Sequence, residues 1–298
     1  MNIRQPSREN VVAVVVTHHP DGELAARLSQ LAPQFAQVII IDNHSQKDEL
    51  AGIQHYSAGQ NNISLIFNRE NVGVAAALNQ GCHLAAEHQA AWVVTFDQDT
   101  TPTADLLSRV ASEWRTQPDR NRIGLIGVNF QSPSGKTLLP AGSGMGDART
   151  VITSGSLLNL DAWRQVGPFR DDFFIDEVDH EYAIRLRRSG WLVKVTRQVL
   201  MAHALGSPRG PQFGRWQPMI SHHSALRRYY MVRNRVLLAR EHIGFDPRFV
   251  ISQLARSLRE GATVVLFEPA KLSKLGAMAR GLIDGLRGRA GRAAGHAP

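Results

Sequence analysis

Two aspartates separated by a single residue form the sharpest chemical feature of the sequence. Asp97, Gln98 and Asp99 directly follow the apolar run AWVVTF at 91–96. Carboxylates at positions i and i+2 can face one cation if the backbone turns there. Such oxygen ligands suit Mg²⁺ or Mn²⁺, which keep coordination positions open for phosphate oxygens. Taken alone, the triplet is typical of a solvated turn or a helix cap, but its place after a buried strand favours a metal site at Asp97 and Asp99.

A second acidic group, FFIDEVDHE at 173–181, places four carboxylates beside apolar residues: Asp176, Glu177, Asp179 and Glu181. An aspartate in a half-buried site can act as a general base for a hydroxyl group. If a helix begins near Asp176, then Asp176 and Asp179 share one face and Glu181 points elsewhere. Acids at the start of a helix also simply complement its dipole, so the spacing does not separate the two interpretations.

Other polar residues follow predicted strands. Asp42 ends the run QVIIID at 37–42, where its carboxylate could accept the imide N–H of a pyrimidine base or a ribose hydroxyl. The alternative is an Asx turn with Asn43, and the two can coexist. His203 follows the run VLMA at 199–202 and could complete a metal's ligand set, although a lone histidine is more often structural.

A run of small and amide residues opens a predicted helix at 74–87. Asn71 and Gly73 precede this helix, and Asn79 and Gly81 lie within it. Gly73 would let the backbone approach a ligand, and small residues would let the helix pack closely on a sheet. The alternative is that Asn71-Val72-Gly73 is only a turn between a strand and a helix.

The elements that must position these residues alternate between strands and helices. We expect buried strands at 11–16, 37–41, 63–67 and 91–96, each followed by a polar loop, with helices at 24–31 and 74–87. This alternation predicts an α/β fold with a Rossmann-like, mostly parallel sheet flanked by helices. Ligands of such sheets bind beyond the carboxyl ends of the strands, so Asp42, Asn71, Asp97 and Asp99 should converge on one edge.

After residue 123 the predicted pattern is mixed. We expect strands at 124–130, 151–156, 191–195 and 199–202, a turn region at 163–169, a helix at 179–189 and a mobile Gly/Pro-rich loop at 204–220. From residue 225 the chain reads as helical, and it frays after residue 287. The expected organisation is therefore one domain at 1–222 and a basic helical C-terminal extension at 223–298.

Composition and cysteine usage limit the compartment. The chain has 298 residues, 43% of them hydrophobic and 20% charged, which is ordinary for a globular protein. Cys82 is the single cysteine, so an intrachain disulfide is excluded and a reducing compartment is expected. The polar N-terminus lacks the apolar core of a signal peptide, and no stretch reaches the roughly 18 apolar residues of a membrane span. We expect a cytoplasmic protein.

Charge is concentrated at the C-terminus. The formal net charge is +8, and residues 227–292 hold 14 Lys and Arg against 5 Asp and Glu. A basic tail on a nearly neutral body favours an anionic partner. No nucleic-acid-binding module is recognisable, and apolar residues alternate with the charges at helical spacing. This pattern predicts contact with an anionic membrane surface and no nucleic-acid partner. A solvated helical face is the alternative.

The ordered set of motifs resembles the family 2 glycosyltransferases, which have the GT-A fold. The matching motifs are VVVT at 14–17, IDN at 41–43, NxGxxxAxNxG at 71–81, DQD at 97–99, TSG at 153–155 and the acidic segment. The nearest likeness is to bacterial rhamnosyltransferases that use dTDP-L-rhamnose. That likeness is carried by FDQD at 96–99, FIDxVDxE at 174–181 and LRRYYxxRN at 226–234, and it extends from about Val11 to about Arg287.

The resemblance implies roles for individual residues. Asp179 would be the catalytic base, Asp42 would contact the thymine base, Asp97 would bind ribose or metal-bound water, and Asp99 would ligate Mg²⁺ or Mn²⁺. His203 resembles a histidine that completes the metal site in related enzymes. Further donor-binding residues would be Thr17, Asn71, Gly73, Asn79, Arg233 and Asn234, and the acceptor-side candidates are Ser154, Asp176 and Glu177. Many relatives have aspartate in place of Gln98, a departure that should not harm ligation, because the middle side chain of an i, i+2 pair points away.

The implied activity is an inverting, metal-dependent transfer of L-rhamnose from dTDP-L-rhamnose to a hydroxyl of a lipid-linked or amphiphilic glycan acceptor. That acceptor would be a precursor of lipopolysaccharide core, O-antigen or a similar cell-envelope glycan, met at the inner face of the membrane. The alternatives are the second rhamnosyltransferase of rhamnolipid synthesis, a transferase of the same fold using another nucleotide sugar, and a non-catalytic nucleotide-sugar-binding module. A nucleotidyltransferase would show a Gly-rich basic loop after its first strand, where this chain has Thr17-His18-His19-Pro20.

Overall fold

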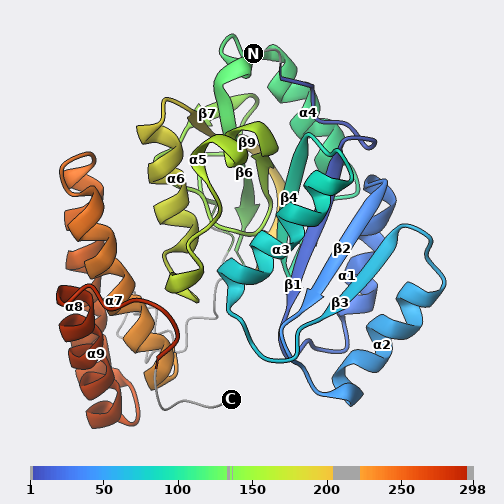
Figure 1. Ribbon diagram of the computed structural model, residues 1–298. Helices are drawn as coiled ribbons and strands as arrows, with labels where there is room; N and C mark the ends of the chain where they lie inside the picture. Colours follow the sequence, from blue (N-terminus) through green and yellow to red (C-terminus); the bar gives the residue numbers. More distant parts are fainter. Residues whose placement is uncertain (1–2, 133–134, 136, 204–221, 294–298) are drawn as a thin grey trace. The chain divides into compact units, whose positions relative to one another are not determined.

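The computed structural model describes residues 3–132, 135, 137–203 and 222–293, and it divides into two compact units. The first unit is Met1–Phe169 with Arg185–Ala204. The second is Arg170–Ile184 with Leu205–Pro298, so the C-terminal helices share a unit with the acidic segment. The division falls inside helix α6 (Val178–Arg188). Figure 1 labels the elements along the chain.

The first unit contains a parallel half-sheet whose inner strands are buried on both faces and whose edge strand is partly exposed. Its strands are β1 (Val11–Thr17), β2 (Gln37–Asp42), β3 (Ile63–Phe67) and β4 (Trp92–Asp97). β1 pairs in parallel with both β2 and β4, and β2 pairs in parallel with β3. Apart from the partly buried Val16, the β-branched residues of β1 and β2 are almost completely buried, as expected for strands covered on both sides.

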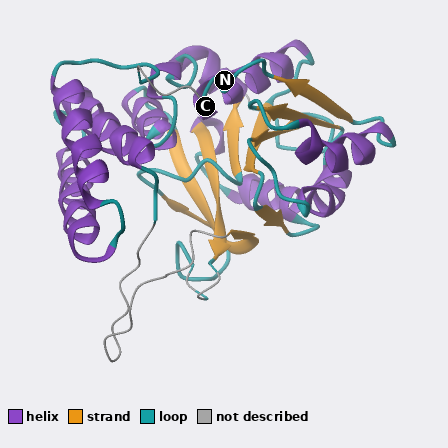
Figure 2. Ribbon diagram, turned by 90° about the horizontal axis from the view of Figure 1, so that it is seen from below, coloured by secondary structure: helices purple, strands orange, loops and turns teal. Residues whose placement is uncertain are grey.

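The other half of the sheet is mixed. Within the described residues one nine-stranded sheet has the order β3-β2-β1-β4-β8-β6-β9-β5, with β7 paired to β9. Its remaining strands are β5 (Thr100–Pro102), β6 (Ile123–Gln131), β7 (Met145–Asp147), β8 (Ser156–Asn159) and β9 (Leu192–His203). β8 runs antiparallel to both β4 and β6, whereas β6 and β9 are parallel. The expected Rossmann-like sheet flanked by helices is confirmed, and Figure 2 shows the strands of the sheet among the surrounding helices.

The helices of the first unit connect these strands. They are α1 (Leu24–Leu31), α2 (Lys47–Ala58), α3 (Val74–Glu87), α4 (Leu106–Thr116) and α5 (Leu160–Val166), with short 3₁₀ turns at Ala32–Gln34 and Arg120–Arg122. α3 packs closely on β1 because Gly81 has no side chain, and a Cβ there would clash with Val14. This close contact holds the middle of α3 against the middle of β1.

Three of the expected elements differ in the structure. The strand expected at 151–156 is β8 at Ser156–Asn159, because Gly155 turns the chain with φ of +75°. The turn region expected at 163–169 is largely α5, whose first turn is capped by the Asn159 side chain. The two strands expected at 191–195 and 199–202 are one strand, β9. The Gly/Pro-rich loop expected at 204–220 lies outside the described residues.

The second unit is helical. It holds the 3₁₀ turn Asp171–Phe173, the first part of α6, and helices α7 (Ala225–His242), α8 (Pro247–Phe267) and α9 (Lys271–Leu286), as the extension predicted from the sequence. α9 packs closely on α7 through glycines. A Cβ at Gly281 would clash with the carbonyl oxygen of Tyr229, and one at Gly285 would lie 2.9 Å from that of Arg233. Among the described residues, no helix combines the length and the apolar character that crossing a membrane requires.

Candidate active site

The ends of the parallel strands gather polar side chains at one edge of the first unit. The register pairs Thr17 of β1 with Asp42 of β2, and Val16 of β1 with Asp97 of β4. Asp97, Gln98 and Asp99 therefore leave the sheet beside the carboxyl ends of β1 and β2. This is the convergence that the sequence predicts, because carboxyl ends of parallel strands meet at one edge.

Asp42 is buried and already accepts several hydrogen bonds. Its Oδ1 accepts from the Thr17 hydroxyl at 2.9 Å and from the Ser45 hydroxyl at 2.5 Å, and its Oδ2 accepts from the Ser45 backbone N–H at 2.8 Å. The alternative to base contact was an Asx turn with Asn43, whereas in the structure the Asp42 carboxylate closes the turn after β2 through Ser45, three residues on. Thr17 and Asp42 together fix the ends of β1 and β2.

Two side chains hold the aspartate triplet in its turn. The buried Ser154 hydroxyl accepts a hydrogen bond from the Asp97 backbone N–H at 3.1 Å and lies 2.6 Å from the Thr100 hydroxyl. The Gln98 side chain accepts from the His18 N–H at 2.8 Å and donates to the His18 carbonyl at 3.1 Å. The middle residue of the triplet thus binds the loop after β1, and both flanking carboxylates start from a fixed backbone.

The loop after β1 is hydrogen-bonded to the residues that precede α3. His18 Nδ1 lies 2.9 Å from the Asn43 carbonyl, and Nε2 lies 3.2 Å from the Asn71 side-chain amide. Asn71 in turn accepts from the Gly73 N–H at 2.9 Å, and Asn43 donates to the Gly73 carbonyl. Burial and the neighbouring His19 lower the pKa of His18, which favours a neutral imidazole at neutral pH. Gly73, with φ of +87°, begins α3 at this point.

Asn79 has a different place from the loop residues. Its amide donates to the Phe169 carbonyl at 2.8 Å, and its carbonyl oxygen accepts from the Phe169 N–H at 2.9 Å. This pair of hydrogen bonds joins α3 to the backbone of Phe169. Asn79 therefore has a structural role in the first unit, because both polar groups of its side chain are bound to that backbone.

The donor set at the triplet fits a hard divalent cation. Asp97 is half-buried and Asp99 is exposed, so carboxylate oxygens leave the sheet at the same turn. The Asp21 carboxylate and, more weakly, Asp99 raise the pKa of Arg27, which also donates to the Gln98 carbonyl at 3.0 Å. Carboxylates at this density suit Mg²⁺ or Mn²⁺. The backbone of His203 pairs with Thr100, next to the triplet, and its side chain lies outside the described part of the structure.

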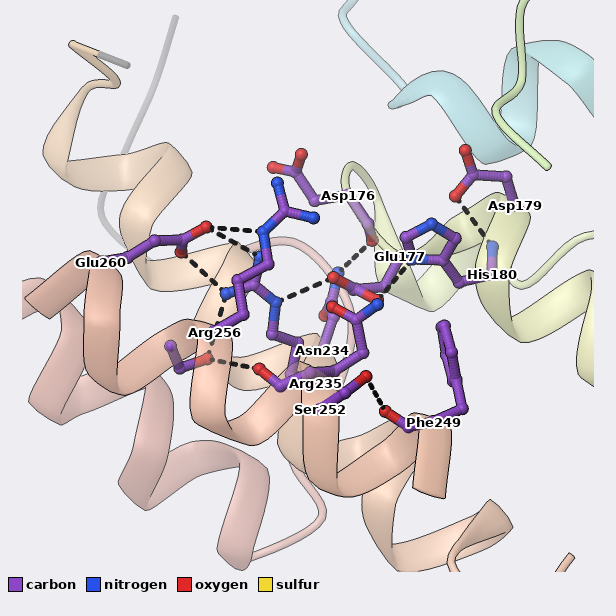
Figure 3. A network of polar contacts seen from close by, with 12 residues as sticks. Asp176, Glu177, Asp179, His180, Asn234, Arg235, Phe249, Ser252, Arg256 and Glu260 are labelled. Atoms are coloured by element: carbon purple, nitrogen blue, oxygen red, sulfur yellow. Dashed lines mark hydrogen bonds and ion pairs between the residues drawn. The ribbon is translucent and has the colours of Figure 1, made fainter. Parts of the chain in front are cut away.

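The second unit presents the acidic segment on a strained backbone. Phe174, Asp176 and Glu177 all have φ of +63°, a left-handed conformation that costs energy for residues other than glycine. The buried Asn234 side chain compensates by lying 2.8–2.9 Å from the carbonyl oxygens of Phe173, Ile175 and Asp176. Figure 3 shows Asn234 beneath this segment.

Arg233 completes this support from the same helix. Its guanidinium donates to the backbone carbonyls of Asp172, Phe173 and Gly291. Its Nε donates to the side-chain oxygen of Asn234 at 3.0 Å. Both residues of the pair expected at the donor are thus buried in α7 and bound to backbone carbonyls. α6 begins at Val178, so the shared helical face expected for Asp176 and Asp179 from a start near Asp176 does not form.

Strong charge pairs surround the acidic segment. Glu177 accepts from Arg235 and from His180, each at 2.9 Å, and Arg227 binds Asp176 at 3.0 Å. Burial alone would raise the pKa of Glu177, but His180 and Arg235 lower it to about 2. Burial would likewise lower the pKa of His180, whereas Asp179 and Glu177 raise it to about 9. A protonated His180 therefore lies beside Asp179, whose carboxylate accepts a hydrogen bond from the His180 backbone N–H at 2.8 Å (Figure 3).

Sequence reasoning missed several residues of both units. His18, Gln98 and Ser45 are bound into the sheet edge, yet the first two carry no metal-ligand spacing and Ser45 reads as an ordinary turn residue. In the second unit the described residues hold a group of Glu181, Glu241 and His242 whose ligand atoms lie within 4.8 Å of one another. The predicted ligands Asp97 and Asp99 are not part of that group.

Comparison with known proteins identifies the class. Residues 13–156 match the family model described as glycosyl transferase family 2. This range covers the parallel half-sheet, the aspartate triplet and Ser154. Residues 13–156 therefore match a family 2 glycosyltransferase domain, and the resemblance found in the sequence is confirmed for that part of the chain.

Individual relatives refine this assignment. The chain is 27% identical over 300 aligned residues to the dTDP-rhamnosyl transferase RfbF of Shigella flexneri, covering 95% of this chain and 97% of the relative. It resembles the solved structure of S. aureus TarS with a TM-score of 0.62 at 13% identity, over 93% of this chain and 49% of TarS, so it spans about half of that protein. It also resembles the mannosyltransferase PcManGT from Pyrobaculum calidifontis, solved with GDP-Man and Mn²⁺, with a TM-score of 0.57 at 14% identity over 93% of this chain and 87% of that one.

Proposed function

We propose that this protein transfers L-rhamnose from dTDP-L-rhamnose to a hydroxyl of a cell-envelope glycan or glycolipid precursor, with inversion at the anomeric carbon. The observation that carries the proposal is the similarity to a dTDP-rhamnosyl transferase along nearly the whole of both chains. The aspartate triplet at the end of β4, in a family 2 domain, supports the use of a nucleotide-sugar donor.

The donor would bind at the edge of the sheet in the first unit. Thr17, Asp42, Asn71, Gly73 and Asp97 all lie at strand ends or at the start of α3 there, and they are proposed to contact the nucleotide. Asn79 is proposed to serve the same region through its hold on residue 169. The two-sided hydrogen bonding of Asp42 and Thr17 would give a base or ribose a fixed acceptor.

Asp97, Asp99 and His203 are the proposed residues for holding Mg²⁺ or Mn²⁺. The side chains present fit such a cation, because the half-buried Asp97 and the exposed Asp99 both offer carboxylate oxygens. Hydrogen bonds of Ser154 and Gln98 fix the turn that carries them. A bound divalent cation would neutralise the negative charge that develops on the departing diphosphate. PcManGT, a relative in fold, was solved with Mn²⁺, which agrees with this chemistry.

Asp179 is the proposed general base. It would remove the proton from the acceptor hydroxyl as that oxygen attacks the anomeric carbon and dTDP departs from the opposite face. A β-linked donor would therefore give an α-rhamnoside. Asp176, Glu177 and Ser154 remain proposed acceptor-side residues. Arg233 and Asn234 are proposed to act by holding the segment that carries Asp176 and Glu177, rather than by touching the diphosphate.

The acceptor is proposed to be an amphiphile presented at the cytoplasmic face of the cell membrane. The basic C-terminal helices support this location, because they would attract the chain to an anionic surface. The second rhamnosyl transfer of rhamnolipid synthesis, and a transferase using another nucleotide sugar, remain the alternatives within this class.

A donor screen tests the proposal. The purified chain is incubated with dTDP-L-rhamnose, UDP-glucose, UDP-GlcNAc or GDP-mannose and an extract of lipid-linked glycans, with and without EDTA. We expect sugar incorporation from dTDP-L-rhamnose alone, and only in the absence of EDTA. Incorporation from another donor would replace rhamnose in the proposal, and nucleotide-sugar binding without any transfer would favour a binding module.

A further inference from the structure

Helices α8 and α9 each expose a continuous apolar stripe. On α8 the exposed residues Ile251, Ala255, Leu258, Ala262 and Val265 recur every three or four positions. At 100° per residue these positions lie on one side of the helix. Leu258 is 78% exposed, which is unusual for a leucine in a helix that also has buried positions.

The stripe on α9 follows the same spacing. Leu272, Ala279, Ile283 and Leu286 are exposed, and Leu272 reaches 88%. The opposite face of α9 is the one that packs on α7 through Gly281 and Gly285. Both helices therefore use one face for the second unit and leave an apolar face uncovered by the described residues.

Cations border these stripes, and the acids lie elsewhere. Residues 247–292 hold nine Lys and Arg but three Asp and Glu. Eight of these nine cations are exposed: Arg248, Arg256, Arg259, Lys271, Arg280, Arg287, Arg289 and Arg292. By helical position Arg248 and Arg259 flank the α8 stripe, and Arg280 and Arg287 flank the α9 stripe.

Each of the three acids is engaged inside the unit. Glu260 binds Arg235 at 2.7 Å, and Glu268 is fully buried with Arg228 and with Lys274 at 2.7 Å. Asp284 accepts from the Tyr229 hydroxyl at 2.9 Å. The internal pairing of the acids leaves a surface of exposed leucines, isoleucine and valine edged by positive charge.

From this arrangement we propose that the exposed faces of α8 and α9 form a docking surface for an anionic lipid bilayer. Leu258 and Leu272 would enter the interface between headgroups and acyl chains, while Arg248, Arg259 and Arg280 contact lipid phosphates. An apolar stripe flanked by arginines is the chemistry that an interfacial amphipathic helix uses. This surface would bring the protein to the amphiphilic acceptor of the proposed function, on which its purpose depends.

Vesicle co-sedimentation of the full chain tests the surface. The probes are phosphatidylcholine vesicles with and without phosphatidylglycerol, at low and high salt. We expect binding to the anionic vesicles that weakens with salt. The double variant Leu258→Glu, Leu272→Glu should bind at least about tenfold more weakly, because two inserted side chains become charged. The matched control Leu138→Glu, at an exposed leucine of the first unit, should bind like the wild type.

Vesicle binding, light scattering and dTDP binding together separate the possible outcomes. Equal binding by the double variant and the wild type, or equal binding to neutral and anionic vesicles, overturns the proposed surface. Light scattering adds a third outcome: a wild-type dimer that the double variant dissociates, without vesicle binding, assigns the stripes to a second copy of the chain and also overturns it. Binding of dTDP by the double variant, followed by calorimetry, should be unchanged, so loss of vesicle binding is separated from failure of the proposed transferase activity.

Discussion

Asp179 is the side chain to which the proposed mechanism gives the proton transfer. Replacing it by asparagine keeps the shape and removes the base, so Asp179→Asn should bind dTDP-L-rhamnose normally while its turnover falls about 100- to 10,000-fold. Transfer rates and donor titration calorimetry on the same preparation measure both quantities. Asp171→Asn, at an exposed acid of the same unit, is the control. Near-normal turnover of Asp179→Asn would remove this residue from the role.

His180 links the acidic segment to pH. Its pKa is about 9 in the folded protein against an ordinary value of 6.5, so its contribution to stability is complete below about pH 6.5 and is lost as pH rises through 9. The free energy of unfolding should therefore fall over this window by on the order of 3 kcal/mol. Urea unfolding at several pH values measures it. His180→Gln should flatten this part of the profile, and an unchanged profile in that variant would contradict the assignment.

At the residue scale, spacing alone identified which side chains could do chemistry but could not identify their partners. Asp97 and Asp99 followed from a carboxylate pair after a buried strand. The partners of Asn79 and Asn234 did not follow, because Asn79 binds residue 169 and Asn234 binds carbonyls 58–61 positions away. An asparagine in a helix carries no sequence signal for a backbone partner that only the tertiary fold brings near.

Among the elements, α7 supports the acidic segment most directly. Asn234→Ala removes the amide that lies against three carbonyl oxygens, so the free energy of unfolding should fall by about 2–3 kcal/mol. If Asn234 positions the segment, turnover should fall while the donor KM stays constant, and Asn234→Gln should not rescue it. Urea unfolding and steady-state kinetics measure these effects.

The matched variant for this prediction is Ser252→Ala on α8, whose hydroxyl only bonds within its own helix. It should leave turnover and stability close to those of the wild type. A parallel rise in KM and fall in kcat for Asn234→Ala would instead assign the pair to donor binding, as the sequence resemblance implied.

The parallel elements were predictable because their signal is local. β1 and β2 are β-branched runs that end in polar turns, and both strands form where the sequence predicts them. The mixed half was harder, because β8 is short and its start depends on the turn at Gly155. Signals for two unpredicted or misread helices were nonetheless present: the capping box of Gln46 and Glu49 opens α2, and the Asn159 cap opens α5.

At the scale of the whole molecule, the sequence indicated a sheet domain and a basic helical tail, and both exist. What it did not indicate is that residues 170–184 join the tail in one compact unit. That grouping depends on contacts of Arg233, Asn234 and Arg235 with the acidic segment, which are separated from it by about sixty positions. Periodicity describes faces of helices and strands but does not state which distant segment a face will cover.

In the proposed mechanism, Asp97 and Asp99 hold a divalent cation without which rhamnose is not transferred. The direct measurement is the rate of transfer from dTDP-L-rhamnose by the chelated chain during back-titration with Mn²⁺, for the wild type and Asp99→Ala. We predict no transfer after chelation and full recovery of the wild-type rate with Mn²⁺. The rate of Asp99→Ala should be about 100-fold lower at the same Mn²⁺ concentration. Undiminished transfer after complete chelation, or a Mn²⁺ titration of Asp99→Ala identical to that of the wild type, would contradict this mechanism.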